Sequence, residues 1–246
     1  MKHDTHNAAP AASAPPDLRK RVFDRVRMSL AHERQFHTVR RDADAWHSLQ
    51  PGVRIKALAR TAVGRSTLVE LAPNATLVPT PGFTQLELVL LEGETFVGSE
   101  AIGCGDAVLA PHDGKHRVSA GPSGARLFLR LSTPDEAPSK LLRFSTLVDD
   151  KSWDDFRPGV RFKALWGDGE RSSLLVRMRA GASVSQHGHP LEEECMMLAG
   201  EAFVGDTLLR SGEYQLAPSG SRHGKVMTDV GALFFVHGSL DPSAYD

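Results

Sequence analysis

Residues 181–223 read GASVSQHGHPLEEECMMLAGEAFVGDTLLRSGEYQLAPSGSRH, and this stretch decides how the chain folds. It contains four side chains of the kinds that bind metal ions, His187, His189, Glu193 and His223. Side chains alternate between the two faces of a β-strand, so a strand through this region places His187 and His189 on one face. A strand that continued to Glu193 would aim it the same way, and His223 has to arrive from another strand. Three imidazoles and a carboxylate are ligands typical of zinc, iron, manganese or nickel.

Glycine and proline residues surround these four side chains at regular spacings. Gly181 lies six positions before His187, and Gly200 lies seven positions after Glu193. The approach to the last histidine follows the order Gly212, Pro218, Gly220 and His223. The stretch resembles the two cupin motifs, G-x5-H-x-H-x3-E-x6-G and G-x5-P-x-G-x2-H. The resemblance implies a double-stranded β-helix, or jelly-roll, barrel with the three histidines and the glutamate as metal ligands. The alternative, four unrelated polar residues in a β-sandwich, does not explain the spacings.

The chain repeats itself at a constant offset of 107 residues. PGVRIKAL at 51–58 recurs as PGVRFKAL at 158–165, and LEGETFVG at 91–98 recurs as LAGEAFVG at 198–205. A period of this length indicates a duplicated domain rather than a solenoid. Each copy consists of short segments rich in β-branched residues, Leu and Phe between Gly, Pro and Asp turns, which is typical of antiparallel strands.

The predicted fold is therefore all-β, with two tandem jelly-roll barrels after a short N-terminal helix. We place the first barrel at residues 42–134 and the second at 135–246. We expect the two to pack against each other around a pseudo-two-fold axis. We also expect the part from Leu141 to Val148 to form the first strand of the second copy.

The two copies differ where metal chemistry would take place. The positions that correspond to His187, His189 and Glu193 are Thr80, Gly82 and Leu86, and only His116 remains from the ligand set. One imidazole does not hold a first-row metal ion with useful affinity. The first barrel is therefore predicted to be metal-free, with a structural or partner-binding role, and His116 to be a buried hydrogen-bonded residue.

The N-terminal region, residues 1–41, is predicted to contain a disordered tail up to about residue 17 and then a basic amphipathic helix. Leu18, Val22, Val26 and Leu30 recur every four residues, and Asp17 suits the N-cap. Two interpretations of this helix differ in what covers its apolar face. It either docks an acidic protein partner or packs on the protein's own barrel, and we favour the second.

Composition excludes several classes of protein. The formal net charge of −1 gives no overall reason to bind nucleic acid, and no run of eighteen apolar residues is present to span a membrane. Cys104 and Cys195 are too few for a disulfide framework. The start of the chain lacks the apolar segment of a secretory signal, so we expect a cytoplasmic protein.

A second resemblance covers about residues 17 to 240. The helix, then Thr38-Val39-Arg40, Trp46, Pro51-Gly52-Val53-Arg54 and the motif at 181–223 together resemble the C-terminal part of ChrR-type anti-sigma factors. In that family a metal-binding cupin domain regulates the release of an extracytoplasmic-function sigma factor under oxidative stress. The family's N-terminal zinc module has an H-x3-C-x2-C motif. This chain has no cysteine before Cys104, so that module is absent or unrecognisable.

Two functions of different class stay open. The first is a regulatory, stress-sensing module, which we favour, and the second is a non-haem metal dioxygenase or related enzyme acting on a small keto, hydroxy or aromatic substrate. Either requires one divalent transition metal ion per chain, with zinc preferred and iron, manganese or nickel as alternatives. We expect the partner to be either a sigma-factor-related protein or a small-molecule ligand. A homodimer is compatible with either function.

Several neighbours of the metal ligands are candidates for further roles. Cys195 lies two residues after Glu193, so the same strand face carries both, and its thiol is either a redox-sensitive neighbour of the metal or a small buried hydrophobe. Four other polar residues are the nearest candidates to line the cavity, and the sequence does not place them: Arg177, Arg179, Tyr214 and His237.

Overall fold

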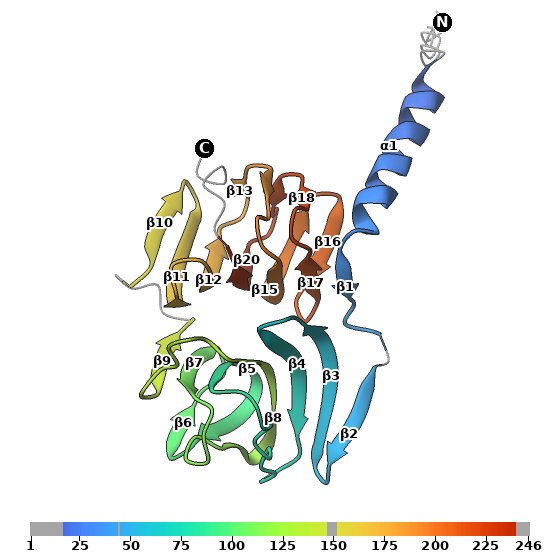
Figure 1. The fold of residues 1–246 in the computed structure, drawn as a ribbon. Coiled ribbons are helices and arrows are strands. Elements are labelled where there is room, and N and C mark those ends of the chain that lie inside the picture. The colour runs from blue at the N-terminus through green and yellow to red at the C-terminus, as the bar shows by residue number, and fades with distance from the viewer. Residues whose placement is uncertain (1–16, 44, 147–151, 240–246) are drawn as a thin grey trace, which may run out of the picture.

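Two curled β-sheets make up most of the protein. The computed structural model describes residues 17–43, 45–146 and 152–239, so nearly all of the predicted N-terminal tail lies outside the described residues. Figure 1 shows one sheet stacked on the other, with helix α1 (Leu18–Glu33) projecting away from the body. The predicted all-β fold of two tandem barrels with a short N-terminal helix is thereby confirmed. Over the described ranges, no helix combines the length and the apolar character needed to cross a membrane.

The first repeat forms an eight-stranded antiparallel sheet. Neighbouring strands follow the order β2-β3-β4-β8-β5-β7-β9, and β6 pairs with β5. The long strands β5 and β8 pair along three stretches separated by two register shifts, which lets a single sheet curl around a core. The strands are β2 (Trp46–Gln50), β3 (Val53–Arg60), β4 (Gly64–Leu71), β5 (Gln85–Val97), β6 (Glu100–Ile102), β7 (Asp106–Pro111), β8 (Val118–Ser132) and β9 (Leu142–Ser145).

The second repeat forms a ten-stranded sheet and a separate two-stranded sheet. The larger sheet follows the order β1-β17-β15-β20-β12-β11-β10, with β13, β16 and β19 paired beside this path, and β14 pairs with β18. The strands are β1 (His37–Val39), β10 (Asp154–Arg157), β11 (Val160–Gly167), β12 (Ser172–Met178), β13 (Ser183–Val184), β14 (His187–Gly188), β15 (Glu193–Val204), β16 (Thr207–Arg210), β17 (Tyr214–Ala217), β18 (Arg222–His223), β19 (Val226–Met227) and β20 (Ala232–Gly238).

Glycines of the repeated motif allow the long strands to approach each other. Gly93 and Gly200 lie one repeat apart, and both have positive φ angles, 81° and 73°. A Cβ atom at these positions would lie 2.1 Å from the carbonyl oxygen of Gly124 and 2.0 Å from that of Gly231. No side chain fits at such a distance, so the glycine in LEGE and LAGE is a steric requirement of the barrel.

The short strands that precede each repeat are exchanged between the barrels. Strand β1, before the first repeat, pairs with β17 of the second. Strand β9, before the second repeat, pairs with β7 of the first, so the expectation that this segment would begin the second barrel is wrong for its described part. Buried lysines at equivalent positions hold both segments, because Lys56 Nζ donates to the carbonyl of Arg40 (2.7 Å) and Lys163 Nζ to that of Ser145 (3.0 Å).

The two barrels share a buried apolar core. Side chains from both repeats meet in one cluster, which includes Phe128, Val89 and Leu68 from the first and Phe235 and Leu175 from the second. The rings of Phe128 and Phe235 lie with centroids 4.9 Å apart, and these two residues are one repeat apart in sequence. Contact between equivalent residues is what a pseudo-two-fold axis through the interface produces, as we expected.

A polar cluster is buried in the same interface. Arg130 is 1% exposed and spans the two barrels through ion pairs with Glu87 (2.8 Å) and Glu194 (3.1 Å). Glu194 also accepts hydrogen bonds from Ser66 of the first barrel and from the hydroxyl of Tyr214 (2.9 Å). The interface is thus fixed by charge pairing as well as by apolar packing.

Helix α1 (Leu18–Glu33) does not pack on the barrel. Its apolar side chains are exposed, among them Val22 at 52% and Phe23 at 54%. Arg25 forms an ion pair with Asp206 of the second barrel at 2.8 Å. The helix itself was predicted correctly, but the expectation that its apolar face would be covered by the protein's own barrel is wrong, as Figure 1 shows.

Candidate metal centre

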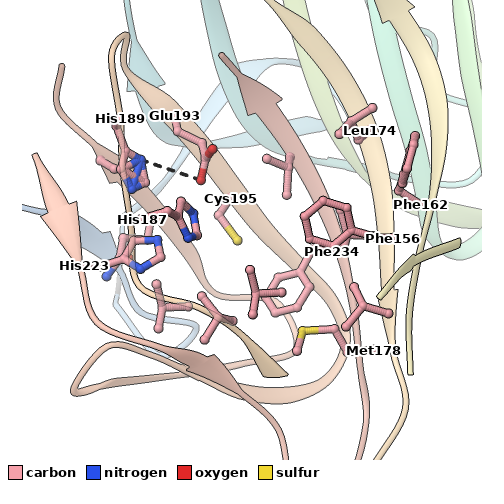
Figure 2. Close-up of a pocket in the computed structure, with 18 residues that line it drawn as sticks. Phe156, Phe162, Leu174, Met178, His187, His189, Glu193, Cys195, His223 and Phe234 are labelled. Atoms are coloured by element: carbon pink, nitrogen blue, oxygen red, sulfur yellow. Dashed lines mark ion pairs between the residues drawn. The ribbon is translucent and has the colours of Figure 1, made fainter. Parts of the chain in front are cut away.

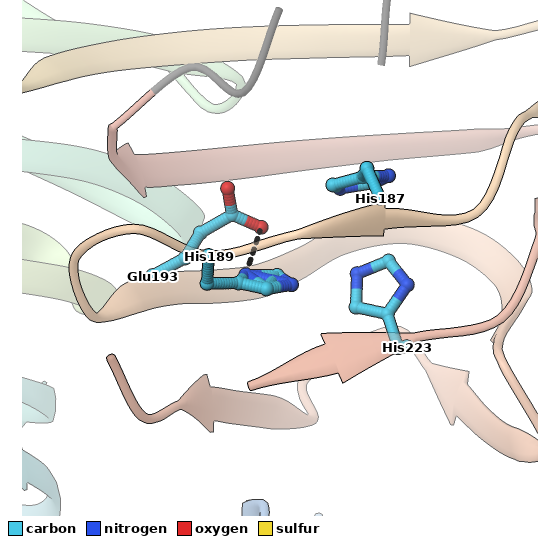
Figure 3. A group of neighbouring side chains, drawn as sticks. All are labelled: His187, His189, Glu193 and His223. Atoms are coloured by element: carbon cyan, nitrogen blue, oxygen red, sulfur yellow. Dashed lines mark ion pairs between the residues drawn. The ribbon is translucent and has the colours of Figure 1, made fainter. Parts of the chain in front are cut away.

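The four predicted metal ligands come together at one end of the second barrel. His187 on β14 lies directly opposite His223 on β18 in the antiparallel register. His189 follows β14, and Glu193 begins β15 after a turn, so it reaches the group from a new strand rather than from the continuation of the first. One ligand atom from each residue lies within 4.8 Å of all the others, and Figure 3 shows the four side chains converging.

Backbone carbonyls set the tautomers of two of these histidines. Nδ1 of His187 lies 2.9 Å from the carbonyl oxygen of Ser185, and Nδ1 of His223 lies 2.8 Å from that of Gly224. A carbonyl only accepts hydrogen bonds, so both Nδ1 atoms carry the proton. Each Nε2 atom then keeps its lone pair, which is the form that binds a metal ion.

Burial also keeps the imidazole of His223 uncharged. Desolvation, followed by the neighbouring imidazole of His187, lowers the pKa of His223 to about 3. The ring of His223 lies 4.4 Å from that of His187 and 4.7 Å from that of His189, measured between centroids. Glu193 supplies a negative charge, with its Oε1 3.8 Å from Nδ1 of His189. A neutral imidazole at His223 beside the carboxylate of Glu193 suits a cation, because a metal ion binds the unprotonated ring.

These observations fit a first-row transition metal ion. Ligand bonds of about 2.1 Å place donors on a shared ion up to about 4 Å apart. The observed limit of 4.8 Å is close to that separation, and small side-chain adjustments would bring all four donors within bonding reach. A divalent ion bound there would supply a Lewis acid, and a six-coordinate ion would also keep two coordination positions open for a ligand.

The four predicted metal ligands lie at one side of a cavity inside the barrel. The cavity has a volume of about 130 Å³ and 18 lining residues, of which 12 are apolar and none is Lys or Arg. Figure 2 shows the three histidines and Glu193 at one side and the rings of Phe156, Phe162 and Phe234 at the other. The sequence analysis did not identify these aromatic residues. Apolar side chains at every second position of a strand were the available signal, because they indicate the face that points into the barrel.

Cys195 lies inside this cavity, as the alternation along the strand predicted. Burial, with the nearby carboxylate of Glu193, raises the pKa of its thiol. Without a metal ion the sulfur is therefore a protonated thiol and a weak nucleophile.

The other candidates for the cavity lining lie elsewhere. None of Arg177, Arg179, Tyr214 and His237 lines the cavity. Tyr214 and His237 precede and follow cavity residues on their strands, so alternation turns them outward into the interface between the barrels. Arg177 donates to the carbonyl of Thr146 and lies over the ring of Trp153.

The equivalent end of the first barrel is packed with side chains. Leu86, which occupies the position of Glu193, is fully buried in the apolar core. His116 is partly buried and its Nδ1 lies 2.8 Å from a carboxylate oxygen of Asp113. Among the described residues, the second barrel supplies the one cluster of three or more metal-binding side chains.

Comparisons with known proteins agree with this fold. Residues 143–241 match the family model of the ChrR cupin-like domain. A comparison with curated protein sequences found no match.

Solved structures also match both barrels together. A provisionally assigned glyoxylate-induced protein from Pseudomonas aeruginosa superposes with a TM-score of 0.66 at 10% identity, over 84% of this chain and 88% of that one. A provisionally assigned dioxygenase from Nostoc punctiforme superposes with a TM-score of 0.63 at 19% identity, over 85% of this chain and 84% of that one. Oxalate decarboxylase from Bacillus subtilis, described with Mn(II) centres, superposes with a TM-score of 0.56 at 14% identity, over 83% of this chain and 77% of that one. At these identities the likeness shows the fold.

Proposed function

We propose that this protein is a metal-dependent regulatory module of the cytoplasm. The second barrel binds one divalent transition metal ion through His187, His189, Glu193 and His223, and the metal centre responds to oxidants or to a small ligand. The observation that carries the proposal is the convergence of the four donors at the wall of an internal cavity. The match of residues 143–241 to the ChrR cupin-like domain supports a regulatory role.

Metal analysis tests the first part of this proposal. Protein purified without added metal and then loaded with zinc should hold one ion per chain, and His187→Ala or His223→Ala should remove it. His116→Ala is the matched control in the first barrel and should leave the content unchanged. Two tightly bound ions per chain, or an ion that survives both substitutions in the second barrel, would contradict the assignment.

A protein partner is also proposed, on the evidence of helix α1. The exposed apolar side chains of the helix stand beside basic residues, which suits an acidic amphipathic helix of a sigma-factor-related protein. Fluorescence anisotropy with a labelled acidic helical peptide measures this directly. Equal binding by the wild type and by a Val22→Asp, Val26→Asp variant would count against it.

The second candidate function is catalysis. A non-haem metal dioxygenase or related enzyme is favoured by one observation, the cavity that begins at the metal-binding side chains. In a six-coordinate ion, four protein ligands leave two positions for substrate or oxygen.

A further inference from the structure

The cavity beside the metal-binding group has a composition that selects its ligand. Three of its lining residues are the phenylalanines 156, 162 and 234, and the lining contains a single carboxylate and no Lys or Arg. Phe156 and Phe162 are arranged edge to face, with ring centroids 6.4 Å apart and planes at 84°. A third ring placed among them would make the same kind of favourable aromatic contact.

The size of the cavity sets the size of the ligand's body. Its volume of about 130 Å³ is close to the roughly 150 Å³ of an engineered apolar cavity that binds benzene. A single six-membered ring therefore fits, and a fused pair of rings does not.

The charge of the site sets the charge of the ligand. A divalent ion bound with the carboxylate of Glu193 leaves one formal positive charge, which a monoanion neutralises. A dianion such as oxalate would leave an uncompensated negative charge in a cavity where no Lys or Arg is present to pair with it.

We infer that the second barrel binds a small aromatic monoanion, a monocarboxylate or phenolate with one ring, whose oxygen faces the metal and whose ring lies among the phenylalanines. This inference rests on the proposed metal site and deepens it, because it names the class of ligand that the regulatory or catalytic centre receives.

Cobalt-loaded protein allows a test that does not depend on activity. Cobalt content is measured first, and the visible absorption of the bound Co²⁺ is then followed during titration with benzoate or oxalate. We expect one cobalt per chain, a saturable spectral change with benzoate, and at least tenfold weaker binding of oxalate.

Substitutions of cavity residues test where the aromatic ring of the bound ligand lies. Val176 pairs with Phe162 on one neighbouring strand and with Phe234 on the other, so Val176→Phe fills the space between them. It should keep the cobalt and weaken benzoate binding at least tenfold. Phe234→Leu, a milder change, should weaken it several-fold, and Val230→Phe, at a position that is 65% exposed, should have no effect.

The outcomes separate the two proposals. Failure to take up cobalt overturns the metal site and this inference with it. Full cobalt uptake without a response to benzoate, preference for oxalate, or benzoate binding that Val176→Phe and Phe234→Leu both leave unchanged overturns only the inference.

Discussion

Arg130 and His237 occupy the same position in the two repeats, 107 residues apart, and touch each other across the interface. Nη2 of Arg130 lies 2.7 Å from Nε2 of His237, and Nδ1 of His237 lies 2.8 Å from Oγ of Ser173. Because the guanidinium only donates, Nε2 of His237 is the acceptor and Nδ1 carries the proton. The duplicated chain thus uses a cation in one copy and a neutral imidazole in the other, at a place where two cations would repel each other.

The first prediction concerns the charge balance of this interface. Arg130→Met leaves Glu87 and Glu194 buried without their cation, so the free energy of unfolding should fall by about 3–5 kcal/mol, measured by denaturant unfolding. Arg210→Met, which removes the exposed pair with Glu201, is the control and should cost at most about 1 kcal/mol.

Neutralising the two carboxylates checks the cause. Adding Glu87→Gln and Glu194→Gln to Arg130→Met should recover part of the lost stability, because an amide needs no counter-charge. A loss of less than about 1 kcal/mol for Arg130→Met alone would show that the ion pairs do not hold the barrels together.

The second prediction is a loss of stability in acid that depends on His237. Burial, then the positive charges of Arg130 and Arg171, lowers the pKa of His237 to about 2. Between that value and the ordinary pKa of about 6.5, the unfolded chain binds a proton that the folded protein does not, so stability falls as the pH falls. The limiting slope is about 1.4 kcal/mol per pH unit.

Thermal unfolding from pH 7 to pH 4 measures this effect. His237→Gln keeps a polar side chain that cannot titrate. The slope of stability against pH should therefore fall by up to the contribution of one proton. The same slope in both proteins would mean that His237 does not contribute to it.

Several features of this molecule were within reach of the sequence, and others were not. The constant offset identified two barrels, and the cupin-like spacing around His187 and His223 identified the group that the structure brings together. Strand alternation alone would not have placed Glu193, because that residue begins a new strand. The boundaries at residues 42–134 and 135–246 stay a prediction. The exchange of β1 and β9 was missed, because a segment of three or four residues does not reveal which sheet it joins.

Helix α1 and the buried polar cluster show two further limits. A repeated apolar position such as Val22 says that a helix has an apolar face but not what covers it. Glu194 was overlooked beside Glu193, although Glu87 preserves it in the first repeat while three of the four predicted ligand positions are lost. Retention in both copies was the available signal that this glutamate serves the interface.

The third prediction concerns the two halves expressed alone. Residues 42–134 without the second half would expose Phe128 and leave the Glu87–Arg130 pair at a surface, and each half would lose one exchanged strand. We expect both halves to aggregate or to unfold at clearly lower temperature than the whole chain, measured by size-exclusion chromatography and thermal unfolding. A half that is soluble, monomeric and as heat-stable as the whole would contradict the shared core.

The last prediction separates a regulatory module from an enzyme. In a regulatory module, zinc satisfies the site, exchange to iron confers no turnover, and oxidant treatment changes metal retention or partner binding. Cys195→Ser tests whether the thiol in the cavity takes part, because its sulfur is the oxidisable group closest in sequence to Glu193. We expect iron-loaded protein to consume no oxygen with small diketones, hydroxy-ketones, phenols and aromatic acids. Turnover in the usual enzyme range of about 1–1000 per second, lost in Glu193→Gln, would overturn the regulatory proposal and establish catalysis.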